Sequence, residues 1–82
     1  MKVKRVISVY DLISDKLIKE ISIDNIPIVE LRKILNIDNN DLDVYQVYPI
    51  SYEQLSMLIH FIPELSDLSL NNAGLYVECF QD

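Results

Sequence analysis

The sequence contains a single cysteine, a single glycine and no tryptophan among its 82 residues. One cysteine, Cys79, excludes an intramolecular disulfide and fits a reducing compartment. One glycine, Gly74, excludes the glycine-rich loop that cradles a nucleotide phosphate. The longest apolar runs fall far short of the ~20 residues of a membrane-spanning helix, and the N-terminus lacks the apolar segment of a signal peptide. We therefore expect a cytoplasmic protein with no membrane partner.

Residues that could carry catalysis or hold a metal are also few. His60 is the only histidine, and Cys79 alternates with apolar residues of a predicted strand. A catalytic triad or a zinc site needs partners for such residues, and the sequence offers none at a recognisable spacing. The acidic segment 38–43 lacks the glycine and the terminal glutamate of a calcium-binding loop. Carboxylates are plentiful, but no pattern pairs them across a cleft, so we expect no enzyme, no metal and no cofactor.

Charge is distributed unevenly along the chain, whose formal net charge is −6. Residues 1–20 contain five basic and three acidic residues, for a net charge of +2. Residues 21–82 contain two basic and ten acidic residues, for a net charge of −8. A surface of this sign repels nucleic-acid phosphates and favours a basic protein partner. The alternative is that the acidic residues only keep a small protein soluble.

Alternation of apolar and polar residues predicts the strands, because successive side chains of a strand point to opposite faces. The link between the first two strands is short, so they are expected to be antiparallel neighbours. The segments with this alternation are 2–10, 17–23, 43–48 and 74–80.

Helical spacing of apolar residues predicts two helices. The first is expected to begin at Pro27, a residue favoured at the first helical position, and to end at Asn36. The second starts at the capping-box pair Ser51 and Gln54, and it is expected to run to Pro63.

Residues 64–72 are predicted to link the second helix to the last strand, with Leu65, Leu68 and Leu70 at the edge of the core. Four strands and two helices in a chain this short predict one α+β domain spanning residues 1–82. We expect a mainly antiparallel four-stranded sheet with the two short helices packed on one of its faces.

The two faces of this sheet differ in character. The face expected beneath the helices comprises Val3, Ile7, Val9, Ile21, Ile23, Leu75, Val77 and Cys79, and Leu17 is expected on the same side of its strand as Ile21. The face expected to be open comprises Val6, Ser8, Tyr10, Ile18, Glu20, Ser22, Tyr76, Glu78 and Phe80, with Val44, Gln46 and Tyr48 from the third strand. Exposed aromatic rings are typical of protein interfaces, and carboxylates around them suit lysine or arginine on a partner.

In length and order of elements, the chain resembles the cloacin-type immunity proteins and the short immunity proteins of contact-dependent and polymorphic toxin systems. The resemblance covers nearly the whole chain. It includes the strand end Val9-Tyr10-Asp11, the helix end at 34–37, the strand and proline-flanked helix at 44–63, and the acidic-aromatic strand at 76–82. The chain departs from that family in having no tryptophan and a lower density of acids.

The resemblance implies a four-stranded antiparallel sheet whose open face and acidic loops bind a basic toxin domain, such as a nuclease. Carried over to this chain, the partner-binding residues would be Tyr10, Glu20, Gln46, Tyr48, Glu78 and Phe80, with Asp41 and Asp43 at the rim. Tyr76 joins this set from its place on the expected open face. We therefore expect an immunity protein that neutralises a toxin domain. The alternative is a small structural or regulatory homodimer that uses the same face or an unpaired strand edge.

Overall fold

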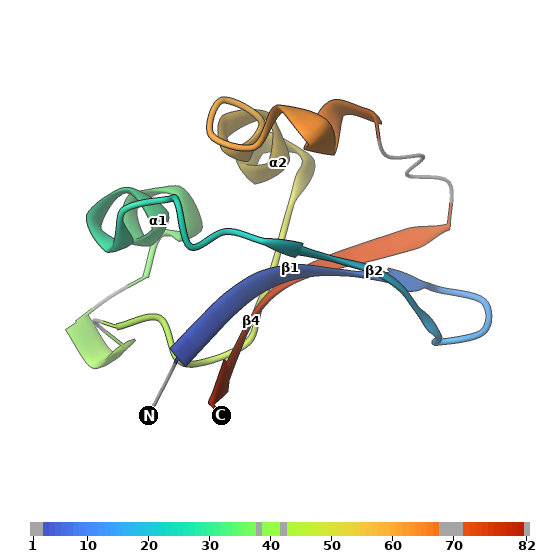
Figure 1. Ribbon diagram of the computed structural model, residues 1–82, viewed down its shortest axis with the longest axis horizontal. Helices are drawn as coiled ribbons and strands as arrows, with labels where there is room; N and C mark the ends of the chain where they lie inside the picture. Colours follow the sequence, from blue (N-terminus) through green and yellow to red (C-terminus); the bar gives the residue numbers. More distant parts are fainter. Residues whose placement is uncertain (1–2, 38, 42, 68–71, 82) are drawn as a thin grey trace.

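The computed structural model describes residues 3–37, 39–41, 43–67 and 72–81. The elements are β1 (Val3–Asp11), β2 (Leu17–Ser22), α1 (Ile28–Leu35), η1 (Asn39–Asp41), β3 (Tyr48–Pro49), α2 (Tyr52–Leu58), η2 (Pro63–Asp67) and β4 (Ala73–Gln81). Figure 1 shows α1 and α2 on the same side of the strands. The predicted α+β class, with a four-stranded antiparallel sheet and two helices, is confirmed.

The sheet brings the two ends of the chain together. Its strand order is β2-β1-β4-β3, and every neighbouring pair is antiparallel. The central strands β1 and β4 pair along their whole length, from Val3 opposite Gln81 to Asp11 opposite Ala73. Their outer ends lie next to each other in Figure 1. The first and last strands therefore form the centre of the sheet and give both of its faces most of their side chains.

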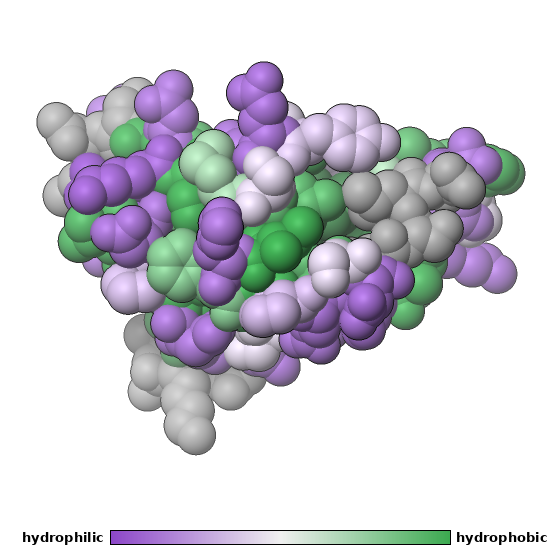
Figure 2. Space-filling view, turned by 90° about the horizontal axis from the view of Figure 1, so that it is seen from above, coloured by the Kyte–Doolittle hydropathy of each residue, from purple (hydrophilic) through white to green (hydrophobic). Residues whose placement is uncertain are grey.

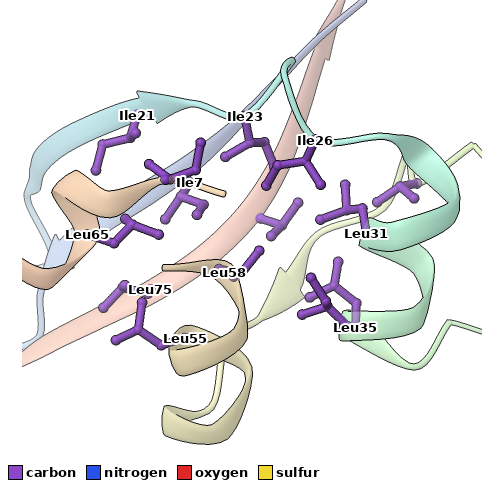
Figure 3. Close-up of a cluster of buried hydrophobic side chains, with 14 of the residues drawn as sticks. Ile7, Ile21, Ile23, Ile26, Leu31, Leu35, Leu55, Leu58, Leu65 and Leu75 are labelled. Atoms are coloured by element: carbon purple, nitrogen blue, oxygen red, sulfur yellow. The ribbon is translucent and has the colours of Figure 1, made fainter. Parts of the chain in front are cut away.

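The core lies between the sheet and the helices. Figure 3 shows Leu31 and Leu35 of α1, Leu55 and Leu58 of α2, and Ile7 of the central strand in the space between the helices and the strands. The buried strand residues on this side are Ile7, Val9, Ile21, Ile23, Leu75 and Val77, as the alternation predicts. Val3 and Cys79, which were expected on the same face, are half-buried near its end. Each fully buried aliphatic side chain contributes roughly 1.5–3 kcal/mol.

The helix boundaries follow local signals. The Gln54 N–H donates to Ser51 Oγ over 3.2 Å, and the Ser51 N–H donates to Gln54 Oε1 over 2.8 Å, so the predicted capping box is confirmed. Helix α1 begins at Ile28, one residue later than expected, because Pro27 is its N-cap and has an extended backbone with ψ 140°. It ends as expected at Asn36, which has a left-handed backbone with φ 55°. Helix α2 ends at Leu58, short of Pro63, which instead begins η2.

The segment after α2 differs from the link expected at 64–72. Its first part is the 3-10 helix η2, which buries Leu65 at the edge of the core. Leu68 and Leu70 lie outside the described residues.

Seen from the helical side, polar side chains surround a hydrophobic area in the middle of the molecule (Figure 2). None of the helices in the described part of the chain has the length and apolarity to cross a membrane.

The third strand predicted at 43–48 is wrong, since only Tyr48 and Pro49 pair with β4. The cause is the side chain of Asp41, which accepts hydrogen bonds from the N–H groups of Tyr45 and Gln46. Backbone groups held in this way are not available to a strand ladder. Val44 also turns the chain, because its φ of 56° is left-handed.

The faces expected for this segment change accordingly. Val44 was expected on the open face, but its side chain is fully buried in the core. Tyr48 was expected there as well, but it lies opposite Val77, so it points to the helical side and packs against the core.

Strand β2 contains an irregularity that the alternation does not predict. Lys19 lies opposite Val9 and Leu17 lies opposite Tyr10, so the register shifts by one residue between the two pairs. A bulge of this kind turns the residues beyond it to the other face. Leu17 was expected on the side of Ile21, but it is turned to the side of Tyr10 and is largely exposed.

Candidate protein-binding surface

The sheet surface opposite the helices is called the open face here. Strand register assigns its members, because residues directly opposite each other in antiparallel strands point to the same face. Ser8 lies between Glu20 and Tyr76, and Val6 lies between Ser22 and Glu78. The open face comprises Lys4, Val6, Ser8, Tyr10, Leu17, Glu20, Ser22, Gly74, Tyr76, Glu78 and Phe80. It contains five of the nine candidate residues: Tyr10, Glu20, Tyr76, Glu78 and Phe80.

The middle of the open face is buried. Val6 and Ser8 were expected to be exposed, but both are buried although they are on this face. Both belong to the central strand β1, between β2 and β4. The accessible surface is therefore formed by the residues around them, which include Lys4 and Tyr10 of the same strand.

A tyrosine–tyrosine–glutamate cluster forms the most ordered part of the open face. The hydroxyl of Tyr10 donates a hydrogen bond to Glu78 Oε1 over 2.9 Å. The rings of Tyr10 and Tyr76 meet edge to face, with centroids 5.9 Å apart and planes at 72°. Edge-to-face packing and a hydrogen bond to a charged group both restrict side-chain rotation. The Glu78 carboxylate is thus held in a defined position and keeps further acceptor capacity, because a carboxylate has about four lone-pair sites.

The same hydrogen bond determines the ionisation of Tyr10. Donation to Glu78 raises the pKa of the Tyr10 phenol, and burial and the negative charge of Glu78 raise it further. The more distant carboxylate of Glu20 acts in the same direction. Tyr10 therefore stays protonated at neutral pH, and it remains a donor to Glu78.

A second carboxylate and an aromatic ring extend this cluster. Glu20 in β2 is exposed, and one strand separates it from Glu78 in β4. Glu20 is level with Tyr76, two residues from Glu78 along β4. With strands ~4.8 Å apart and a rise of ~3.3 Å per residue, the two acidic positions are roughly 12 Å apart. Phe80 is 44% exposed near the end of β4, opposite Lys4. Rings flanked by carboxylates can accept a guanidinium or ammonium group by hydrogen bonding and by contact with the ring.

The other candidate acids lie in a separate structure, the loop 41–48. Asp41 was expected at the rim of the open face, but its side chain is only 7% exposed. It accepts hydrogen bonds from the Tyr45 N–H over 2.9 Å, the Gln46 N–H over 3.0 Å and the Tyr48 hydroxyl over 2.6 Å. Burial raises the pKa of Asp41, but these bonds outweigh it and the pKa is lowered overall. Asp41 therefore acts inside the loop as a structural acceptor.

Arg5 attaches this loop to the sheet, which the sequence pattern did not indicate. Its guanidinium donates to the carbonyl oxygen of Asp43 through Nε over 3.1 Å and through Nη2. The same guanidinium lies over the ring of Tyr45, 5.7 Å from its centroid. The signal that could have revealed it is a lone cation at an apolar-face position of β1, between Val3 and Ile7. Gln46 and the side chain of Asp43 remain exposed.

An apolar groove adjoins the open face, and the sequence pattern did not predict it either. It has a volume of about 440 Å³, and its lining includes Leu12, Pro49, Ile50, Tyr52, Gly74 and Tyr76. Tyr76 belongs to both surfaces, because it lies on the open face beside Pro49. The groove draws on three segments that are far apart in the sequence, so no local pattern indicates it.

The residues with potential for metal binding or catalysis are dispersed. Within residues 3–37, 39–41, 43–67 and 72–81, no three His, Cys, Asp or Glu side chains are grouped in a way that could hold a metal ion. His60 is exposed after α2, whereas Cys79 is half-buried in β4. What the described geometry offers is surface for recognition: a carboxylate-and-ring cluster beside an apolar groove.

Comparison with known proteins yields one match. The family model described as "Domain of unknown function (DUF7683)" matches residues 4–71. The match extends from β1 past η2, and so includes both helices and the loop 41–48. No curated protein and no solved structure matches the chain.

Proposed function

We propose that this chain, which belongs to the DUF7683 family, is a cytoplasmic immunity protein that binds and neutralises a basic toxin domain, such as a nuclease. The observation that supports the proposal is the open face. Among the described residues, no helix or loop of the chain lies over Glu20 or Phe80, and both side chains are exposed. The adjoining Glu78 is already positioned by Tyr10.

The chemistry of recognition follows from these groups. Lysine and arginine side chains that line the substrate groove of a nuclease bind phosphate oxygens. The carboxylates of Glu20 and Glu78 would accept the same donors, and the rings of Tyr76 and Phe80 would pack against their alkyl or guanidinium parts. Inhibition would then result from occupation of the groove, without any reaction on the part of this protein. Positioning Glu78 in advance reduces the entropy that is lost on binding.

The charge of the chain supports a fast encounter with such a partner. Residues 21–82 have a net charge of −8, so a cationic protein is attracted over a distance before contact. Charge complementarity of this kind mainly raises the association rate and makes it sensitive to salt. The association rate with the toxin domain should therefore fall as ionic strength increases, while dissociation changes less.

The proposal predicts that a toxin domain is encoded beside this gene, and the direct test uses that domain, purified and assayed on plasmid DNA and total RNA. Stoichiometric inhibition by the wild-type protein is expected, with a much weaker effect of Glu78→Lys. The matched control is Glu64→Lys, which makes the same charge change at an exposed position of η2, away from the open face. A toxin domain that remains fully active in molar excess of the wild-type protein would overturn the proposal.

A second candidate function is a structural or regulatory homodimer. The observation in its favour is that β2 is an edge strand of the sheet and that Leu17 and Ile18 on it are largely exposed. Such edges can pair with another copy. The net charge of −6 on each copy opposes this association. Light scattering coupled to size-exclusion chromatography distinguishes the two functions, because a monomer at micromolar concentration argues against the homodimer.

A further inference from the structure

The apolar groove beside the open face has a defined architecture. Three segments form it: the loop after β1, the turn from β3 into α2, and the start of β4. Backbone hydrogen bonds fix their positions, from the Leu12 N–H to the Asn72 carbonyl over 2.8 Å and from the Ile50 N–H to the Leu75 carbonyl over 2.9 Å. The groove is therefore preformed, as ligand-binding sites in proteins usually are.

Two apolar side chains that line the groove, Leu12 and Tyr52, are largely exposed to solvent. Leu12 is 55% exposed and Tyr52 is 76% exposed. Single exposed apolar residues are common, but here two of them flank a groove whose lining is mostly apolar. Contact with an apolar group from another molecule would remove this surface from water, which is favourable.

Gly74 shapes the wall of the groove. A Cβ atom at this position would lie 3.0 Å from Leu12 Cδ2 and 3.4 Å from the Tyr76 ring. The backbone of Gly74 lies in a regular strand and has no positive φ, so its conformation does not require glycine. What the glycine provides is space between Leu12 and Tyr76.

The groove and the tyrosine–tyrosine–glutamate cluster are one continuous surface. Tyr76 contacts the ring of Tyr10 on the open face and also lines the groove. The acidic surroundings continue past the groove, because the exposed Glu53 follows Tyr52 in the first turn of α2. A molecule that contacts Glu78 and reaches past Tyr76 would meet an apolar slot next.

We propose that this groove receives one aliphatic or aromatic side chain of the same basic partner whose cations meet Glu20 and Glu78. The inference deepens the proposed function and rests on it. Charge complementarity selects this occupant, since a second copy of the chain has a net charge of −6 and would bring like charge to an acidic surface. The partner surface is thus defined chemically as one buried apolar anchor with lysine or arginine beside it.

The test uses two capped heptapeptides that differ at one position, Lys-Arg-Gly-Leu-Gly-Arg-Lys and Lys-Arg-Gly-Ser-Gly-Arg-Lys. Each is titrated into the nitrogen-15-labelled protein and followed by amide chemical shifts. The leucine peptide is expected to perturb amides around Ile50, Tyr52 and Gly74, and to bind about ten-fold more tightly than the serine peptide, as burial of a leucine side chain predicts. The serine peptide is expected to perturb only open-face amides.

Two variants test whether the groove causes the preference for the leucine peptide over the serine peptide. Gly74→Val fills the space between Leu12 and Tyr76, so it should abolish the preference for the leucine peptide. Valine is chosen because β-branched residues are favoured in strands. The control Val29→Ala removes an exposed apolar side chain of α1 that does not line the groove, and it should leave the preference unchanged. The toxin domain itself should bind Gly74→Val about ten-fold more weakly than Val29→Ala.

The outcomes separate this inference from the proposed function. Equal binding of the two peptides, a leucine preference that survives Gly74→Val, or no binding of either peptide would overturn the groove inference. The immunity function would stand in those cases if Glu78→Lys still weakens the toxin complex. If Glu78→Lys leaves the toxin complex unchanged, the open face is not the binding surface and both proposals fail.

Discussion

Within the part of the chain that the structure describes, the tyrosine–carboxylate hydrogen bonds of Tyr48 and Tyr10 lie in contrasting surroundings. In the loop 41–48, the Tyr48 hydroxyl donates to Asp41 over 2.6 Å, and two backbone N–H groups donate to the same carboxylate. On the open face, the Tyr10 hydroxyl donates to Glu78 over 2.9 Å. The first carboxylate is buried and its acceptor capacity is used within the chain, whereas the second is half-buried and retains capacity.

Backbone position explains this difference. Asp41 stands at the start of an irregular loop, so the amides that follow it are free to turn back toward its side chain. Glu78 stands within a strand, where the neighbouring amides belong to the ladder and side chains project away from it. An acid in a loop therefore tends to organise its own backbone, while an acid on a strand face is presented outward.

Asp41 also stabilises an unfavourable backbone at Val44. A left-handed conformation costs an ordinary residue roughly 1–2 kcal/mol, and β-branched residues tolerate it poorly. Val44 adopts it with φ 56° while its side chain is fully buried in the core. The hydrogen bonds that Asp41 accepts from Tyr45 and Gln46 hold the chain in this turn. Stability in this region thus depends on one carboxylate.

The largest effect on stability is expected for Asp41→Ala, which removes the carboxylate that accepts three hydrogen bonds in the loop 41–48. Loss of three hydrogen bonds to a charged group should reduce the free energy of unfolding by about 3–4 kcal/mol. That is a large part of the ~4–12 kcal/mol expected for a domain of this size. Urea unfolding measures it, and Asp41→Asn, which keeps one acceptor oxygen, should lose less.

The matched control for this prediction is Asp43→Ala. The side chain of Asp43 is exposed, and its contact with Arg5 is made through the backbone carbonyl. Its removal should change the unfolding free energy by less than about 0.5 kcal/mol. Equal effects of the two alanine variants would show that Asp41 does not hold the loop.

The next largest effect on stability is expected when the tyrosine hydroxyl is removed from one of the two pairs. Tyr48→Phe should cost about 1.5–2 kcal/mol, because it leaves a buried carboxylate without one of its donors. Tyr10→Phe should cost clearly less, because Glu78 is more accessible to water. Urea unfolding of both variants under the same conditions provides the measurement. A larger loss for Tyr10→Phe would reverse the roles assigned to the two pairs.

The two hydrogen bonds should also fail at opposite ends of the pH range. The pKa of Asp41 is lowered from 3.8, so its stabilisation is present above that value and is lost as pH falls through the lowered pKa. The pKa of Tyr10 is raised from 10.0, so its stabilisation is present below that value and is lost as pH rises through the raised pKa.

Stability measured against pH checks both signs. The difference between wild type and Asp41→Asn should shrink as pH falls below 3.8, and that between wild type and Tyr10→Phe should shrink as pH rises above 10.0. An ultraviolet absorbance titration should also show that Tyr10→Phe lacks a tyrosine that ionises late. Differences that stay constant with pH would contradict the assigned hydrogen bonds.

The contrast also explains how far the sequence predicts the structure. Caps depend on neighbouring residues, so Ser51 and Gln54 located the start of α2 and Asn36 located the end of α1, whereas Pro63 did not mark the end of α2. Strand parity placed Ile7 and Val77 correctly, because both lie in long regular strands. The segment 43–48 has the composition of a strand, and its actual path depends on the side chain of Asp41 and on the distant Arg5.

The candidate site also has a part that the sequence predicts and a part that it does not. Tyr10, Glu20, Tyr76, Glu78 and Phe80 were placed on one face by alternation alone. The groove could not be predicted, since it requires the loop after β1, the turn before α2 and the start of β4 to be brought together. Contacts between segments distant in sequence leave no local periodicity by which they can be recognised.

A small effect on stability, and the largest effect expected on binding, belongs to Glu78→Lys. The substitution removes the acceptor of Tyr10, but water can replace it at a half-buried position, so the unfolding free energy should fall by less than about 1 kcal/mol. Reversal of one charge at the centre of the open face should weaken the complex with a basic toxin domain by at least about ten-fold. Glu20→Lys, at the edge of the same face, should weaken it less. Calorimetry of the toxin complex together with urea unfolding separates the two effects: a loss of stability as large as that of Asp41→Ala would show that Glu78, like Asp41, mainly holds the fold.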